Sequence, residues 1–174
     1  MKKIAILYES VEGHTATVVE RMDAIFQETG CAVTKVRCKA SSIQAIEEAD
    51  GIVIGGSIHA GRHNKKLIRF VADHRDLISV KPNAFFLVCL TANYDTPEKK
   101  SEVEGYLREF ETRTGLTPGV SHAFAGAILY TKYNFVIRAI MKSIAKKEGG
   151  DTDTSRDHIY TDWQAVETFA RDFL

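Results

Sequence analysis

The sequence has few of the residues that mark several classes of protein. Its three cysteines, Cys31, Cys38 and Cys89, are spaced neither as a disulfide framework nor as a zinc site. We interpret them as reduced, buried thiols in a cytosolic compartment. The chain also has no excess of charge of either sign, because 23 basic side chains balance 23 acidic ones. That balance argues against a dedicated nucleic-acid binder.

Long apolar runs are absent as well. The amino-terminal MKKIAILY is too short for the core of a signal peptide and lacks a small-residue cleavage site. No run approaches the roughly 20 apolar residues that a membrane-spanning helix needs, so any membrane contact is expected to be peripheral. The 174 residues, 44% of them hydrophobic, are enough for one domain with its own core, spanning residues 1–174.

Short apolar runs alternate with helix-like segments along the chain. The predicted strands are Lys3–Tyr8, Ala32–Val36, Gly51–Gly55, Ala84–Leu90 and His122–Ile128. The predicted helices are Thr15–Glu28, Lys65–His74, Pro97–Gly115, Tyr130–Lys147 and Thr161–Leu174. Such alternation forms a parallel sheet with helices on both faces. It predicts a doubly wound α/β fold of five parallel strands in the order 2-1-3-4-5.

The first strand leads into ESVEGHTATV, residues 9–18. In a doubly wound fold, ligands bind at the carboxyl ends of the strands, near the point where the strand order reverses. Backbone N–H groups at this place can hold an anion together with the hydroxyls of Ser10 and Thr15, and Gly13 permits a tight turn. Neither GxxxxGK[ST] nor GxGxxG is present, which excludes the two best-known phosphate loops. The loop predicts a monophosphate held by the backbone; a simple N-capped helix start is the alternative.

Two further loops follow neighbouring strands. GGSIHAGRH, residues 55–63, has glycines on both sides of His59, which suits a loop lying against a planar ring. A surface turn with incidental histidines is the alternative. His59 and His63 have no third ligand nearby, so no metal site is predicted. The segment LTANY, residues 90–94, follows the fourth strand.

Three loops with small and polar residues at adjacent strand ends predict a flat cofactor with a phosphate tail. A phospho-receiver domain has the same topology, but it needs an acidic pair after the first strand and an aspartate after the third. This chain has Ser10 and Ser57 near those places, so we set that interpretation aside.

These residues carry a resemblance to known proteins. ILYESVEGHT resembles the FMN phosphate loop of flavodoxins, although Glu12, Gly13 and His14 are not its commonest residues. VIGGSIHAGRH and the carboxy-terminal KKEGGDTDTSRDHIYTDWQAVETFARDF resemble one flavodoxin-like family, the bacterial quinone-dependent protoporphyrinogen IX dehydrogenases. The GG-D-TDT-R and YTDW elements are the most specific part. The resemblance spans nearly the whole chain and is weakest in Pro97–Gly115.

The resemblance implies FMN as cofactor and protoporphyrinogen IX as substrate, in haem biosynthesis. It implies removal of six electrons and six protons in two-electron steps, with the electrons passed to menaquinone or ubiquinone. Together with the three loops, it predicts these cofactor-binding residues: Ser10, Val11, Glu12, Gly13, His14, Thr15, Ser57, Ile58, His59, Gly61, Thr91, Ala92, Asn93, Gly126, Asp153 and Thr154. No catalytic side chain is identified; His59, His63, Asn93 and Lys132 are candidates for a supporting role.

Residues 130–150 are an insertion relative to a short flavodoxin. The segment YTKYNFVIRAIMKSIAKK contains no acid, and its basic residues are Lys132, Arg138, Lys142, Lys146 and Lys147. The spacing of Arg138, Lys142 and Lys146 predicts one basic stripe on a helix whose other side, from Phe135 to Ile144, is apolar. A basic amphipathic helix is typical of a membrane-surface or partner-binding element.

The candidates for contact with the substrate's propionates or with anionic lipid are Lys132, Arg138, Lys142 and Lys146. The alternative for this segment is a helix that packs its apolar side on the sheet and shows its lysines to water. The contact with lipid would place the protein at the cytoplasmic side of the bacterial inner membrane. A homo-oligomer is compatible with the sequence.

Two other flavin functions stay open at this point. A one-electron flavodoxin is a carrier, and carriers of that kind are typically strongly acidic, so the neutral charge and the basic insertion count against it. A nicotinamide-fed FMN quinone reductase would need a second nucleotide site, for which no motif is present, unless both ligands share the flavin face. A flavin-free interaction module is the remaining alternative.

Overall fold

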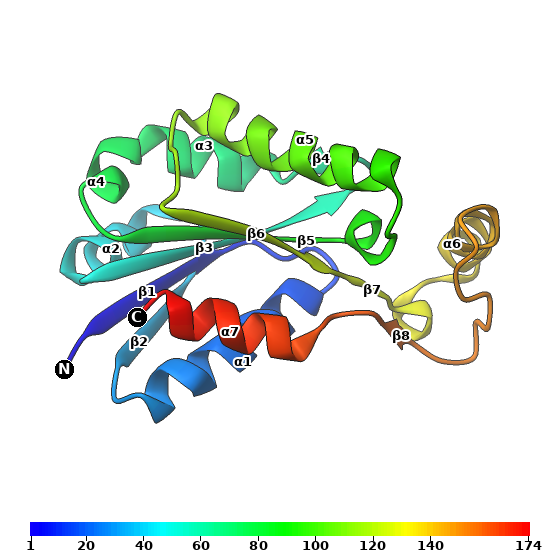
Figure 1. The fold of residues 1–174 in the computed structure, drawn as a ribbon, viewed down its shortest axis with the longest axis horizontal. Coiled ribbons are helices and arrows are strands. Elements are labelled where there is room, and N and C mark those ends of the chain that lie inside the picture. The colour runs from blue at the N-terminus through cyan, green and yellow to red at the C-terminus, as the bar shows by residue number, and fades with distance from the viewer.

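Five parallel strands form the centre of the computed structural model, which describes residues 1–174. They lie in the order β2-β1-β3-β5-β6, which confirms the predicted order 2-1-3-4-5 (Figure 1). The strands are β1 Lys3–Tyr8, β2 Ala32–Val36, β3 Gly51–His59, β5 Asn83–Cys89 and β6 Val120–Ala125. The short strand β4 (Arg62–His63) folds back on the end of β3 in an antiparallel pair.

Helices cover both faces of this sheet. The helices on one face are α1 (His14–Glu28) and α7 (Trp163–Asp172). Those on the other are α2 (Ile43–Glu48), α3 (Lys65–Asp73), α4 (Arg75–Ser79) and α5 (Pro97–Thr114). The sequence did not predict α2 and α4, because helices of five or six residues are too short to show a full apolar period.

The core consists of two apolar layers, one on each side of the sheet. Alternate residues of a strand point to opposite faces, so Ile4 and Ile6 enter one layer while Ala5 and Leu7 enter the other. All four side chains are buried, which explains why β1 reads as a continuous apolar run rather than an alternating one. In the second of these layers Phe85 of β5 stacks on Phe110 of α5, with ring centroids 3.7 Å apart.

The insertion differs from the single helix predicted for Tyr130–Lys147. The chain forms a 3-10 turn, η3 (Tyr130–Lys132), and then the helix α6 (Phe135–Lys147). Asn134 divides the two, since its side-chain oxygen accepts a hydrogen bond from the N–H of Ile137 and thereby starts the helix. The predicted strand His122–Ile128 is likewise divided at Gly126: its end, β7 (Ala127–Ile128), pairs with β8 (His158–Ile159).

Helix α6 lies beyond the carboxyl ends of the strands and not on a face of the sheet (Figure 1). Only Ala145 of this helix is buried, and the side chain of Phe135 is 82% exposed. The alternative of a helix packed on the sheet is therefore wrong. No helix in the structure has both the length and the apolar character to span a bilayer.

The ring of Phe86 lies over Gly55 and leaves no room for a side chain there. A Cβ atom there would lie 2.4 Å from the Cζ atom of Phe86, its partner on β5 and a fully buried ring. We expect Gly55→Ala to lower the free energy of unfolding by about 1–3 kcal/mol, the usual cost of overpacking a core. Urea denaturation measures this difference.

Gly105→Ala is the matched control. Gly105 lies within α5, and a Cβ atom there would meet nothing within 4 Å. The same substitution should therefore raise the stability, by about 0.5–1 kcal/mol, because alanine favours a helix interior. Equal midpoints for Gly55→Ala and the unaltered protein would contradict the close contact between Gly55 and the Phe86 ring.

Candidate functional site

A cavity of about 510 Å³ opens at the carboxyl ends of the central strands. The loops after β1, β3 and β5 line it, together with residues of α5 and α6. The predicted cofactor-binding residues among its lining are Ser10, Val11, Glu12, His14, Thr15, Ser57, Ile58, His59, Gly61, Thr91 and Gly126. The structure thus brings together the three loops that the sequence placed at adjacent strand ends.

The loop after β1 leaves the start of α1 without a side-chain cap. Gly13 is the capping residue, with a φ of 99° that favours glycine, and its N–H donates to the Ser10 hydroxyl at 3.1 Å. The helices α3, α5, α6 and α7, in contrast, all begin with a capping side chain. The N–H groups in the first turn of α1 have no partner within the helix and stay available to an anion.

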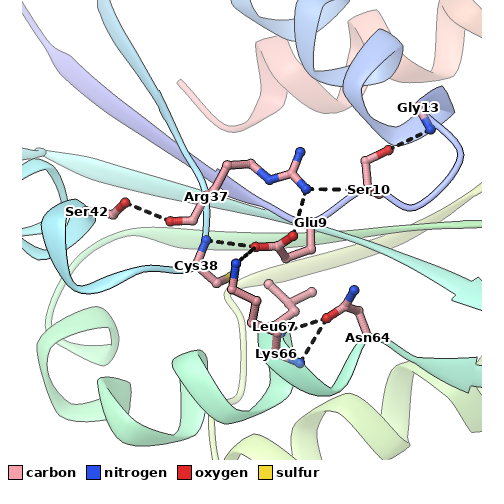
Figure 2. A network of polar contacts seen from close by, with 9 residues as sticks. All are labelled: Glu9, Ser10, Gly13, Arg37, Cys38, Ser42, Asn64, Lys66 and Leu67. Atoms are coloured by element: carbon pink, nitrogen blue, oxygen red, sulfur yellow. Dashed lines mark hydrogen bonds and ion pairs between the residues drawn. The ribbon is translucent and has the colours of Figure 1, made fainter.

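The buried carboxylate of Glu9 holds this loop in place (Figure 2). It accepts hydrogen bonds from the Arg37 guanidinium at 2.7 Å and from the N–H of Cys38 at 3.0 Å, and the Lys66 ammonium lies 3.1 Å away. Arg37 also donates to the backbone carbonyl of Ser10 at 3.3 Å. Burial alone would raise the pKa of Glu9, but the hydrogen bonds from these three donors more than offset it and lower the pKa. Glu9 is therefore a charged structural anchor beneath the loop.

Glu12 joins the loop after β1 to His59, at the end of β3, and to the insertion. Its carboxylate accepts a hydrogen bond from the Tyr133 hydroxyl at 2.7 Å and lies 3.5 Å from Nδ1 of His59. Burial, with a further contribution from Glu12, raises the pKa of the Tyr133 phenol, so Tyr133 remains a hydrogen-bond donor. One acidic side chain thus sets the spacing between three walls of the cavity.

His14 connects the loop to the YTDW element. Its Nε2 lies 2.6 Å from the Thr161 hydroxyl, which itself donates to the carbonyl of Ala125 at 2.7 Å. The Thr161 oxygen therefore accepts a hydrogen bond from Nε2–H of His14. Burial lowers the pKa of His14, and the nearby Lys132 ammonium lowers it further, which favours the neutral imidazole.

Two polar residues of α5, Glu102 and Tyr106, also line the cavity, and neither was predicted from the sequence. The Tyr106 hydroxyl donates to Glu102 at 2.7 Å, and the Thr91 hydroxyl donates to the same carboxylate oxygen at 3.4 Å. Burial, followed by the hydrogen bond to Glu102, raises the pKa of Tyr106 to about 12. A glutamate and a tyrosine four residues apart, on the helix that follows a ligand loop, are the only sequence signal for this pair.

The apolar side of α6 forms the remaining wall. The residues of this helix that line the cavity are Ile137, Ile140, Met141 and Ile144. They are the apolar side that the sequence predicted, but they face the cavity instead of the sheet. This wall faces polar loops and can shelter an apolar ring system.

Several predicted residues lie outside the cavity. Ala92 packs against the core, and Asn93 is exposed in the turn η2 (Leu90–Asn93). The Asp153 carboxylate accepts hydrogen bonds from the N–H and the hydroxyl of Ser155, so it orders its own turn, and Thr154 is not among the lining residues. Gly13 shapes the loop without lining the cavity.

His63 also lies away from the cavity. Its ring is buried between Phe85, Tyr106 and Phe110, and its Nε2 lies 2.8 Å from the carbonyl of Tyr106. It therefore braces α5 against the sheet, and a supporting role for it would be indirect.

The basic residues of the insertion point in different directions. Arg138 turns back on the chain, with its guanidinium donating to the carbonyls of Tyr130 and Tyr133, both at 3.1 Å. The predicted stripe of three cations is therefore wrong for Arg138. Lys142 and Lys146 are exposed, and Lys132 reaches toward the loop after β1.

The site fits a flavin nucleotide. Free N–H groups and hydroxyls at the start of α1 suit a phosphate, and the apolar wall opposite the strand ends suits a flat ring. Fold and site together define the class of the molecule, a flavodoxin-like flavoprotein.

Comparison with known proteins identifies the family. Residues 5–155 match the model of the flavodoxin domain. The chain is 35% identical to the protoporphyrinogen IX dehydrogenase (quinone) of Leishmania major, over 98% of this chain and 74% of that protein. It is 31% identical to the Escherichia coli K12 protein of the same name, over 98% and 93% of the two chains. The chain belongs to the flavodoxin-domain family and, within it, to the quinone-dependent protoporphyrinogen IX dehydrogenases.

Solved structures agree on the fold. Oxidised flavodoxin 1 from Bacillus cereus superimposes with a TM-score of 0.58 at 18% identity, covering 99% of this chain and 97% of that one. Oxidised flavodoxin 2 from the same organism gives a TM-score of 0.57 at 17% identity, over 98% and 97% of the chains.

The anchoring role of Glu9 is testable by substitution. Glu9→Gln removes the charge that Arg37, Lys66 and Cys38 surround, and we expect a loss of about 1–3 kcal/mol in the free energy of unfolding at neutral pH. Because the pKa of Glu9 is lowered from its ordinary value of 4.5, its contribution is present above that pH and lost as the pH falls through the folded-state pKa. The difference between the two proteins, measured by urea denaturation, should therefore shrink below about pH 4.5.

Glu104→Gln serves as the control. Glu104 pairs with Arg108 on the surface of α5, and both side chains are 67% exposed. Its loss should cost at most about 0.5 kcal/mol. An effect of Glu9→Gln as small as that of the control would show that Glu9 does not anchor the loop.

Proposed function

We propose that the protein oxidises protoporphyrinogen IX to protoporphyrin IX with bound FMN and passes the electrons to menaquinone or ubiquinone, as a step of haem biosynthesis. The observation that carries this proposal is the cavity itself, in which a phosphate-type loop faces a wide apolar wall built by the insertion. The names of the two relatives support the substrate and the acceptor class.

FMN is the flavin that the loop favours. The loop offers N–H groups and hydroxyls for one phosphate, and the sequence contains no GxGxxG for a dinucleotide. When bound, FMN supplies the electron-pair chemistry, and the protein supplies binding, orientation and shelter from water. The loops after β3 and β5 would hold the ring edge, with His59 and Thr91 at the cavity wall.

The residues of α6 would shape the place of the organic substrates. Porphyrinogen and quinone are both largely apolar, and Ile137, Ile140 and Ile144 present apolar surface to the cavity while remaining 41%, 49% and 47% exposed. Such a wall is open enough for exchange of one substrate for the other. Glu102 and Tyr106, which also line the cavity, are polar groups that can receive or orient protons.

The outer surface of α6 supports a peripheral location at the cytoplasmic side of the bacterial inner membrane. Phe135 and Val136 are exposed, and Lys142 and Lys146 are exposed on the same helix, which contains no acid. Each lysine near an anionic bilayer contributes about 1 kcal/mol to binding. Quinones reside in the bilayer, so a cavity wall that also touches lipid would shorten their path.

The activity is tested by following porphyrin fluorescence under anaerobic conditions. The FMN-loaded protein is mixed with protoporphyrinogen IX, with and without a menaquinone analogue. We expect fluorescence to grow at a sustained rate only when the quinone is present. A flavin-containing protein that leaves porphyrinogen unchanged under both conditions would contradict the proposal and favour a one-electron carrier.

The membrane contact is tested by charge reversal. Lys142→Glu with Lys146→Glu should release the protein from vesicles that contain anionic lipid, because two attractions become two repulsions. Vesicle sedimentation measures the bound fraction, and flavin absorbance verifies that FMN stays bound.

The matched control for this change is Arg108→Glu with Arg113→Glu. This pair of substitutions changes the net charge by the same amount, but in the carboxy-terminal half of α5, which runs toward the amino ends of the strands. This variant should sediment like the unaltered protein. Release of both variants to the same extent would show that overall charge, and not α6, determines the binding.

A further inference from the structure

We infer that Lys132, a residue of the insertion, is the cationic ligand of the FMN phosphate. The inference rests on the proposed function, and it assigns a phosphate contact to a segment that lies far from the phosphate loop in sequence. The loop itself contains no lysine or arginine. The Lys132 ammonium reaches it from 120 residues further along the chain.

The position of the ammonium group is the first observation. Its Nζ atom lies 3.4 Å from the carbonyl oxygen of Glu12 and 3.2 Å from the place that a Cβ atom on Gly13 would occupy. Gly13 caps α1, so the ammonium stands beside the free N–H groups of the first helical turn. An anion held by those N–H groups would lie within reach of this cation and form a charge-assisted hydrogen bond with it.

The other cations near the loop are already engaged. Arg37 and Lys66 both bind the Glu9 carboxylate, beneath the loop (Figure 2). Lys132 has no carboxylate partner and donates only the long hydrogen bond to Glu12. A phosphate would therefore supply the counter-charge that Lys132 lacks.

The turn that carries Lys132 is held firmly. The Tyr130 side chain is fully buried, and its hydroxyl donates to the carbonyl of Asp151 at 2.9 Å. The N–H and the hydroxyl of Thr131 donate to the Asp157 carboxylate at 2.9 and 2.8 Å. Because the two preceding residues are fixed, little backbone freedom is lost when Lys132 binds an anion.

The contact couples the cofactor to the insertion. The same segment continues into α6, whose apolar side forms one wall of the cavity. Phosphate binding by Lys132 would therefore fasten that wall to the loop after β1. A flavin without phosphate would fill the ring site and leave the wall less firmly attached.

Riboflavin, which lacks the phosphate, makes the inference testable. FMN and riboflavin are titrated into the full-length chain after removal of bound flavin, and binding is followed by quenching of flavin fluorescence. We expect Lys132→Gln to weaken FMN binding about tenfold, the loss of one charge-assisted hydrogen bond at an exposed site, and to leave riboflavin binding unchanged. Lys132→Arg should restore most of the FMN affinity.

Lys142→Gln is the matched control, because it removes the same charge from the same insertion and should leave both affinities unchanged. The thermal midpoint of flavin-free Lys132→Gln should equal that of the unaltered protein, since Lys132 is exposed. As a second measurement, FMN should slow amide hydrogen exchange in Tyr130–Lys147 more than saturating riboflavin does.

Equal loss of affinity for both flavins, or no loss for either, would overturn the inference while leaving FMN binding by the protein intact. If FMN and riboflavin slow amide hydrogen exchange in the insertion equally, phosphate binding does not fasten the α6 wall to the loop, and that part of the inference is overturned. An unaltered protein that binds neither flavin would instead overturn the proposed function, and this inference with it.

Discussion

One buried carboxylate determines where the functional loop lies. Glu9 is 5% exposed at the end of β1, and a charge buried that deeply is tolerated only when its hydrogen bonds are made. Its donors come from the segment after β2 and from α3, namely Arg37, Cys38 and Lys66. Because these elements are fixed by the sheet, their contacts hold the start of the loop in place. The uncapped start of α1 consequently faces the cavity, opposite the wall that α6 provides.

Much of the fold follows from local pattern. Strands buried on both faces leave continuous apolar runs such as KIAILY and AFFLVCL, and their alternation with helices determines a parallel sheet. Topology then places the ends of those strands at one edge, so the sequence alone predicts that the three polar loops share one site. The YTDW element has a structural role that explains its specificity: its Thr161 forms a hydrogen bond with His14 of the loop after β1.

The parts that sequence did not reveal depend on contacts distant in the chain. The apolar side of α6 was visible, but nothing local says that it faces a cavity beyond the strand ends and not the sheet. Arg138 has the spacing of a surface cation, yet carbonyls of the preceding turn bind it. Glu102 and Tyr106 lie on an otherwise polar helix, where a spacing of four residues is their only sequence signal. Lys132 contacts a loop that lies 120 residues earlier in the chain, and residue spacing does not predict contacts over so long a sequence separation.

In the proposed reaction, electrons pass from porphyrinogen into a flavin held in this cavity and from there to quinone. The most direct test separates the two half-reactions in a rapid-mixing experiment without oxygen. The oxidised flavin absorbance of the FMN-loaded protein should disappear on mixing with protoporphyrinogen IX alone, and it should return on addition of a menaquinone analogue. Flavin that stays oxidised with porphyrinogen, yet is reduced by a nicotinamide, would contradict the account.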